Sequence, residues 1–312
     1  EIVTNGGATI EVDALSFLTL TGTDAITGGS LTNTGAITDS GNLTLASEQV
    51  TNNSGGVITE GGGHTLTVSN TTVAGAGSIT IGGTATLTGT DAISGISPTT
   101  TGSLTNTGSI TDSGTVTLTD ETVTQSPGGT FTVGTGDTLT LTNSTLTDGG
   151  LILGSGATLN LSNAQLNNIT LSGTNYIINI TGNSSIDGVH NIISGNITVD
   201  ALQTLLVDDS LLIATVTNDG TVKVGSGKIS DFGGAASITG GNLINLGTID
   251  IFDPFSSVST VTFANLQVTN SAGGVITVGT GGAADTLTLT STTLTNAGAI
   301  TVDGNALLLL NG

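Results

Sequence analysis

The sequence predicts an all-β fold, a parallel β-helix or β-solenoid of about 12–15 coils with roughly 20–26 residues in each coil. Three observations support this prediction. Stretches of sequence recur along the chain, short apolar runs alternate with small polar residues, and an Asn or Asp shortly before Gly returns at a regular interval. We expect one continuous solenoid covering residues 1–312.

The recurring stretches are the first observation. LTNTGAITDSGNLTLASEQVTN, residues 31–52, returns as LTNTGSITDSGTVTLTDETVTQ, residues 104–125, with 15 of 22 positions identical. The shared positions hold mainly Thr, Gly, Asn, Asp and aliphatic residues, which suit the stacking of coils more than catalysis. These stretches belong to longer copied segments, each several coils long. Residues of about 18–83 are related to residues of about 85–150, and residues 262–301 resemble residues 44–80.

The second observation is a period of two. Leu43 and Leu45 bracket Thr44, and clusters of Gly, Asn, Asp and Ser separate such runs, a pattern typical of short strands and turns. We find no sustained helical stripe of apolar residues. The nearest case, DALQTLLVDDSLLIATV at residues 200–216, is interrupted by Asp208 and Asp209, and we predict two strands around a turn there.

The third observation is an Asn or Asp close before Gly, at intervals of roughly 20 residues early in the chain and about 26 later. Such turns suit a solenoid, because Asn satisfies backbone groups locally and Gly adopts conformations that other residues avoid. A propeller blade needs about 40 residues, and the leucine spacing of leucine-rich repeats is absent. We also expect the Asn side chains to hydrogen-bond from coil to coil. The markers begin at Asn33, Asn53, Asn106, Asp148, Asn218, Asn245, Asn270 and Asn296.

The composition argues against several functions. The chain has 23 Asp and Glu but only two Lys, Lys223 and Lys228, and no Arg, which gives a net charge of −21. This charge repels phosphate backbones and anionic lipids, so we expect no nucleic-acid binding. We expect no direct membrane insertion either, because no apolar stretch has transmembrane length. The chain has no Cys, and its start has no recognisable signal peptide.

Coils such as LTNTGAIT, residues 31–38, and GGVITVGTG, residues 273–281, resemble those of bacterial haemagglutinin-repeat and autotransporter-passenger proteins, which are large secreted adhesins. The similarity covers most of the chain and is strongest in residues 29–141 and 262–301. It implies a right-handed parallel β-helix at the bacterial cell surface, where such proteins bind surfaces or other cells. No invariant motif accompanies it, so we expect no catalytic, cofactor-binding or metal site.

Sharper functions have weaker support. A polysaccharide-degrading β-helix enzyme needs Lys or Arg near clustered carboxylates, but we interpret Asp208–Asp209 as a solvated turn and expect no enzyme. His64 and His190 lie beside glycine turns without a partner motif. GTGDTL at 134–139 and GGAADTL at 281–287 resemble isolated halves of calcium-binding turns, so at most weak, incidental Ca²⁺ binding is expected.

Ice binding is the alternative function, because paired threonines on one flat solenoid face can order water. The array lapses between about Asn143 and Asn218. A separate cluster of Phe residues either stacks in the core, which we favour, or forms a contact on a protruding loop. The Thr-x-Thr runs begin at Thr65, Thr86, Thr115, Thr138 and Thr286, and the clustered aromatics are Phe232, Phe252, Phe255 and Phe263.

The predicted function is therefore that of a secreted or cell-surface structural and adhesive rod. Neither end of the sequence shows a polar cap, and open solenoid ends are templates for strand pairing. We expect self-association end to end, as in an extracellular filament subunit, or continuation into neighbouring segments of a longer chain. Surface or cell receptors are the other expected partners.

Overall fold

The computed structural model describes the chain except residues 98, 253, 256–257 and 280–283, and it describes no side chains at residues 189–191. Every regular element in this described part is a β-strand. The strands are parallel and form about 14 turns of a β-solenoid, which confirms the predicted all-β solenoid. The chain divides into two compact units, Glu1–Leu159 and Asn160–Gly312. A single continuous solenoid over residues 1–312 stays a prediction.

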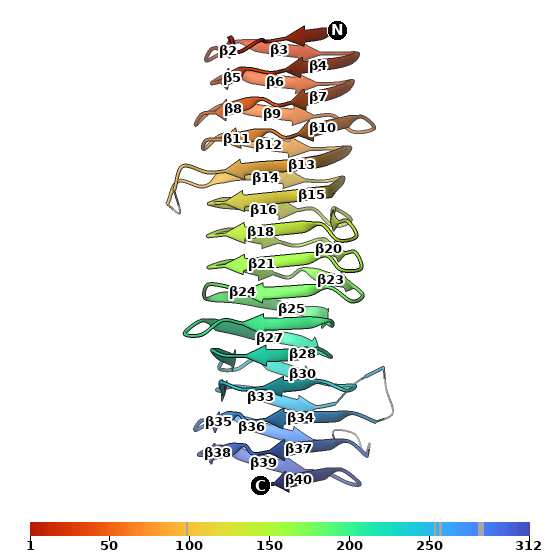
Figure 1. Cartoon of the computed structure of the whole chain (residues 1–312), viewed down its shortest axis with the longest axis vertical. Helices are drawn as coiled ribbons and strands as arrows, with labels where there is room; N and C mark the ends of the chain where they lie inside the picture. The colour runs from red at the N-terminus through yellow and green to blue at the C-terminus, as the bar shows by residue number, and fades with distance from the viewer. Residues whose placement is uncertain (98, 253, 256–257, 280–283) are drawn as a thin grey trace. The chain divides into compact units, whose positions relative to one another are not determined.

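Unit 1 places three strands in each coil, and strands of successive coils pair in parallel to form three sheets (Figure 1). Sheet 1a contains β1 (Ile2–Thr4), β4 (Thr23–Thr27), β7 (Asn42–Ala46), β10 (Thr65–Ser69), the first parts of β13 (Thr84–Ser94) and β15 (Ser109–Thr119), β17 (Thr130–Val133) and β20 (Gly150–Leu153). Sheet 1b contains β2 (Thr9–Val12), β5 (Ser30–Asn33), β8 (Gln49–Asn52), β11 (Thr72–Ala74), the second parts of β13 and β15, and β18 (Thr138–Thr142). Sheet 1c contains β3 (Phe17–Leu20), β6 (Ala36–Asp39), β9 (Val57–Glu60), β12 (Ser78–Ile81), β14 (Gly102–Asn106), β16 (Glu121–Gln125) and β19 (Thr145–Thr147).

Unit 2 follows the same three-strand plan, and β21 (Thr158–Ser162) spans the boundary residue. Sheet 2a contains β23 (Thr170–Gly173), the second parts of β25 (Ser184–Ile193) and β27 (Thr204–Leu212), β30 (Ile229–Phe232), β33 (Thr248–Ile251), β36 (Val275–Val278) and β39 (Ala299–Val302). Sheet 2b contains β24 (Ile177–Ile180), β26 (Asn196–Val199), β28 (Thr215–Asn218), β31 (Ser237–Thr239), β34 (Thr260–Ala264), β37 (Thr286–Thr290) and β40 (Leu307–Asn311). Sheet 2c contains β22 (Gln165–Asn167), the first parts of β25 and β27, β29 (Thr221–Val224), β32 (Asn242–Asn245), β35 (Gln267–Asn270) and β38 (Thr293–Asn296).

The Asn/Asp-x-Gly sequence forms the corners between sheets. In each case the Gly amide donates a hydrogen bond to the side-chain Oδ1 of the Asn or Asp two residues earlier, at 2.9–3.2 Å. These bonds satisfy a backbone donor where the strand ladder is interrupted. The pairs are Asn33–Gly35, Asp39–Gly41, Asn106–Gly108, Asp112–Gly114, Asn218–Gly220, Asn245–Gly247 and Asn296–Gly298.

The corner glycines are needed for space. A Cβ on Gly108 would lie 1.9 Å from the carbonyl oxygen of Gly83 in the preceding coil, and one on Gly41 would lie 2.0 Å from that of Gly22. Neither glycine has a positive φ, so the close approach of the coils, rather than left-handed backbone, excludes other residues. At these two corners the close approach of the preceding coil therefore requires Gly.

The Asn side chains also link the coils, as predicted. Asn33 Nδ2 donates to Asn52 Oδ1 at 2.9 Å, in the next coil of sheet 1b. In sheet 2c, Asn245 donates to Asn270 at 2.8 Å and Asn270 to Asn296 at 2.7 Å. Each Asn in this ladder is buried except Asn296. The side chains of Asn33 and Asn245 each satisfy their own corner and also bond the next coil.

Alternating aliphatic residues fill the interior of both units. Phe131 in unit 1 is fully buried, as are Tyr176, Phe232 and Phe263 in unit 2. The rings of Phe232 and Phe263 meet edge to face with centroids 5.9 Å apart, so core stacking is confirmed for these two residues. Phe255 is 74% exposed, so it does not share that packing.

The chain turns at Asp208 and Asp209, as predicted, but the turn is a corner within one strand and not a solvated turn between two. β27 runs through both residues, although Asp209 has a positive φ of 49°. The first part of β27 pairs with β29 and the second part with β30, so the chain turns a corner within one strand. Asp208 is buried rather than solvated, because it lies on the inner side of this corner.

Candidate functional site

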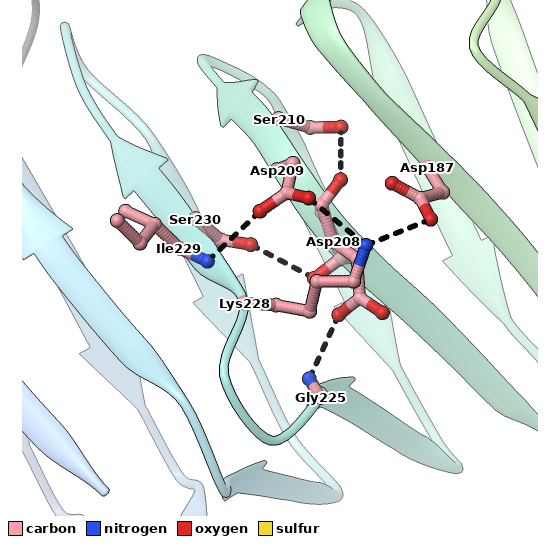
Figure 2. A network of polar contacts seen from close by, with 9 residues as sticks. Asp187, Asp208, Asp209, Ser210, Gly225, Lys228, Ile229 and Ser230 are labelled. Atoms are coloured by element: carbon pink, nitrogen blue, oxygen red, sulfur yellow. Dashed lines mark hydrogen bonds and ion pairs between the residues drawn. The ribbon is translucent and has the colours of Figure 1, made fainter.

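Lys228 lies at the centre of a polar network at the corner between sheets 2c and 2a (Figure 2). Its Nζ donates to Asp209 Oδ2 at 2.9 Å and to Asp187 Oδ2 at 3.1 Å. Asp187 belongs to β25, Asp209 to β27, and Lys228 immediately precedes β30, so the network crosses successive coils. The neighbouring Asp208 accepts a hydrogen bond from the Gly225 amide at 2.7 Å.

The electrostatics of this network favour a structural role. Hydrogen bonds to Asp209 and Asp187 raise the pKa of Lys228 above its usual value. Burial opposes ionisation of Asp209, yet the Ile229 amide and the Lys228 ammonium hold its pKa below the usual value. Burial raises the pKa of Asp208 despite its bond from Gly225. An ammonium held charged by two carboxylates cannot accept a proton, so Lys228 is not a general base in this arrangement.

The longest exposed column of like side chains lies on sheet 1c. One threonine from each of seven successive coils stands in strict register, half-buried or exposed, with its hydroxyl on the outer face. At about 4.8 Å per coil, the column is about 29 Å long. Its members are Thr19, Thr38, Thr59, Thr80, Thr105, Thr124 and Thr147.

Sheet 1a carries a broader array in which two hydroxyl-rich columns run side by side over five coils. The inner member of each pair is Thr44, Thr67, Thr86, Thr111 or Thr132, and its partner two residues earlier is Asn42, Thr65, Thr84, Ser109 or Thr130. The sequence pairs beginning at Thr115 and Thr138 lie instead on sheet 1b, in register with each other. The Thr-x-Thr pairs of unit 1 therefore occupy two sheets rather than one face.

The remaining residues singled out in the sequence do not assemble into a site. His64 lies near Asp39 and Glu60; burial raises the pKa of both carboxyls, and His64 opposes the rise. The side chain of His190 lies outside the described residues, as do residues 281–283 of the second calcium candidate. Within the described part, no group of three His, Cys, Asp or Glu side chains is arranged to hold a metal ion. Weak Ca²⁺ binding stays a prediction.

Buried carboxylates are the feature that sequence reasoning missed. Asp39 and Asp112 replace Asn at two corners, and in each the Oδ2 atom is buried without a hydrogen-bond partner. Burial raises the pKa of Asp112 to about 6, with smaller contributions from nearby Asp137 and Asp91. Burial likewise raises the pKa of Glu121 to about 8. The available signal was an Asp in the marker position that elsewhere holds mostly Asn.

Comparisons with known proteins add little to this geometry. No family model matches the chain, and no curated protein matches it. A solved structure that is similar is the crystal structure of a TibC-catalysed hyper-glycosylated fragment of TibA, with 17% identity, a TM-score of 0.37 and coverage of 98% of this chain and 99% of that chain. Likeness at this level says nothing about function. The resemblance to haemagglutinin-repeat and autotransporter-passenger proteins stays a prediction.

Proposed function

We propose that this protein is a structural and adhesive β-solenoid of the bacterial cell surface or extracellular space. The threonine column of sheet 1c carries this proposal. A hydroxyl both donates and accepts hydrogen bonds, and a β-branched side chain on a stacked strand has few rotamers to lose on binding. Weak contacts repeated at a fixed spacing add up to strong attachment without any single deep site.

The test of adhesion is attachment of protein-coated particles. Latex beads coated with the full chain should adhere to cultured epithelial cells or to bacterial lawns well above albumin-coated beads. Replacing Thr59, Thr80 and Thr105 together by Val keeps β-branched side chains in the column but removes its central hydroxyls. If beads coated with the unmodified protein attach no better than albumin-coated beads, the proposal is contradicted.

Ice binding is the second candidate, and the five-coil array of sheet 1a favours it. Paired columns of small, similar side chains on a rigid sheet present a regular lattice to water. The assay is inhibition of ice recrystallisation, with Thr67→Lys and Thr86→Lys as disrupting variants in the middle of the array. Loss of inhibition in these variants would identify sheet 1a as the ice-binding face, and a wild-type protein without inhibition eliminates this candidate.

End-to-end association is part of the adhesive proposal, and electron microscopy tests it directly. Negative staining of the purified chain should show filaments one solenoid wide if copies pair through their terminal coils. Separate particles over the same concentration range would remove the filament from the proposal and leave adhesion to be judged by bead attachment.

Among the described residues there is no helical segment with the length and hydropathy of a membrane span.

A further inference from the structure

A shallow groove of about 310 Å³ runs along the outer face of sheet 2c. Its floor follows one register column, in which Gln165 pairs with Ser185, Ser185 with Leu206, and Leu206 with Lys223. The column steps through four successive coils, about 14 Å in all, so the groove suits an extended ligand. Five further residues line it: Asn163, Ala164, Asn183, Ser184 and Thr204.

The polar groups of this groove differ from those around Lys228. Within the described part of the chain, no carboxylate forms an ion pair with Lys223, whereas Lys228 is held by two. Asn183 Oδ1 accepts a hydrogen bond from the Thr204 amide at 2.9 Å, which fixes the side chain at the groove. Gln165 is exposed at the opposite end of the column. The groove thus offers an ammonium and amides, held by paired strands.

The charge of the protein decides which polar ligand fits. A net charge of −21 opposes the approach of a polyanion, and a single ammonium cannot offset that repulsion along an extended chain. A neutral ligand with many hydroxyls meets no such barrier, because amide side chains donate and accept hydrogen bonds and the ammonium donates up to three. Leu206 supplies an apolar patch against which C–H groups of the ligand can pack.

We propose that this groove, formed by β22, β25, β27 and β29, binds a segment of a neutral polysaccharide without cleaving it. The proposal rests on the adhesive function above and names the ligand class that one of its faces recognises. Cleavage is not part of it, since the nearby Asp187 and Asp209 are already held by Lys228.

Binding to defined polysaccharides tests the groove. The full chain is titrated with mannan, dextran and xyloglucan as neutral probes and with polygalacturonate as the anionic comparator. We expect at least one neutral probe to bind, and Gln165→Leu and Lys223→Met each to weaken it about tenfold or more. Gln267→Leu is the matched control, because Gln267 is an exposed glutamine on the same sheet outside the groove. Its affinity should stay within twofold of the unmodified protein.

The outcomes separate this inference from adhesion itself. No binding of any neutral probe below about 1 mM, preference for polygalacturonate, or unchanged affinity in both groove variants would overturn it. Circular dichroism of each variant shows whether the fold is intact, and Asn183→Asp provides a second, polar change at the groove if an apolar substitution unfolds the chain. Beads that adhere to cells equally well with both groove variants would leave adhesion standing without the groove. Polysaccharide binding by a protein whose beads do not adhere would leave the groove standing alone.

Discussion

Replacing Asp112 by Asn should stabilise unit 1 at neutral pH. Asp112 Oδ1 accepts the Gly114 amide at 2.9 Å, and an amide oxygen can keep that bond. The buried Oδ2 has no partner, so ionisation of Asp112 in the folded state creates a buried charge that the Gly114 amide compensates only in part. An Asn at this corner carries an N–H₂ group instead, the arrangement that Asn106 uses to reach the next coil.

The size of the effect follows from the raised pKa. Burial moves the pKa of Asp112 from 3.8 to about 6. A difference of one in pKa corresponds to about 1.4 kcal/mol, so the ionised Asp112 side chain costs about 3 kcal/mol of folding stability. Burial of the Asn amide in the variant reduces the net gain to about 1–2 kcal/mol. Above pH 6 the folded state bears the full cost. The folded state takes up the proton as the pH falls through about 6, so the cost shrinks towards pH 3.8, and below 3.8 both states are protonated and the cost is gone.

The assay is denaturant unfolding of both proteins, followed by circular dichroism at intervals between pH 4 and pH 8. The midpoint of Asp112→Asn should exceed that of the wild type at pH 7.5, and the difference should shrink towards pH 4. The reciprocal control is Asn106→Asp, which removes donor bonds to Gln125 Oε1 and Thr130 O, both 3.0 Å long. Asn106→Asp should lower the free energy of unfolding by about 2–4 kcal/mol at pH 7.5. A less stable Asp112→Asn, or a gain independent of pH, refutes the reasoning.

Three further predictions use the same structure. Gly108→Ala should destabilise unit 1 by about 3 kcal/mol or more, because the added Cβ would lie 1.9 Å from a backbone oxygen. Gly62→Ala is the control and should cost under about 1 kcal/mol, because the nearest atom to its Cβ is 3.8 Å away. Equal denaturation midpoints of the two variants would contradict the prediction. The stability of the wild type should fall as the pH rises from about 4.5 to 8, because burial raises the pKa of Glu121 in the folded state to about 8. Glu121→Gln should remove this fall, and parallel pH profiles of the two proteins would contradict the prediction. Lys228→Met should lower stability by about 1 kcal/mol because its ion pairs are partly exposed, and 1 M NaCl should reduce the loss; a salt-independent loss would indicate packing instead.

The corner chemistry explains why the fold was predictable from the sequence. At corners such as Gly108 a glycine that meets the backbone of the preceding coil follows an Asn or Asp that bonds its amide, and this combination is visible in the sequence as a spacing. The ladders from Asn33 and Asn245 follow from the same spacing once the coils stack. Period-two alternation then assigns most aliphatic residues of the strands to the interior, so both the solenoid and its core follow from local sequence patterns.

The candidate sites were not predictable in the same way, because they depend on which coils become neighbours. Lys228 meets Asp187 from 41 positions earlier, and no local pattern signals that contact. The continuity of β27 through its corner also escaped prediction, because Asp208 and Asp209 between two apolar runs are typical of a turn that separates two strands. The groove column from Gln165 to Lys223 likewise joins single residues of four coils, which differ in length and in side chain.

The copied segments show how the corner chemistry limits what the repeats reveal about function. Asn33 ends a strand of sheet 1b, whereas its counterpart Asn106 ends a strand of sheet 1c, so the copy is rotated by one face. This rotation is tolerated because the corners of different sheets use the same Asn/Asp-x-Gly bond. Similar sequences therefore lie on different faces of the solenoid. The seven threonines of the sheet 1c column come from non-equivalent positions of the copied segments. The exposed faces, where binding must occur, are set by the stacking of coils and not by the repeat.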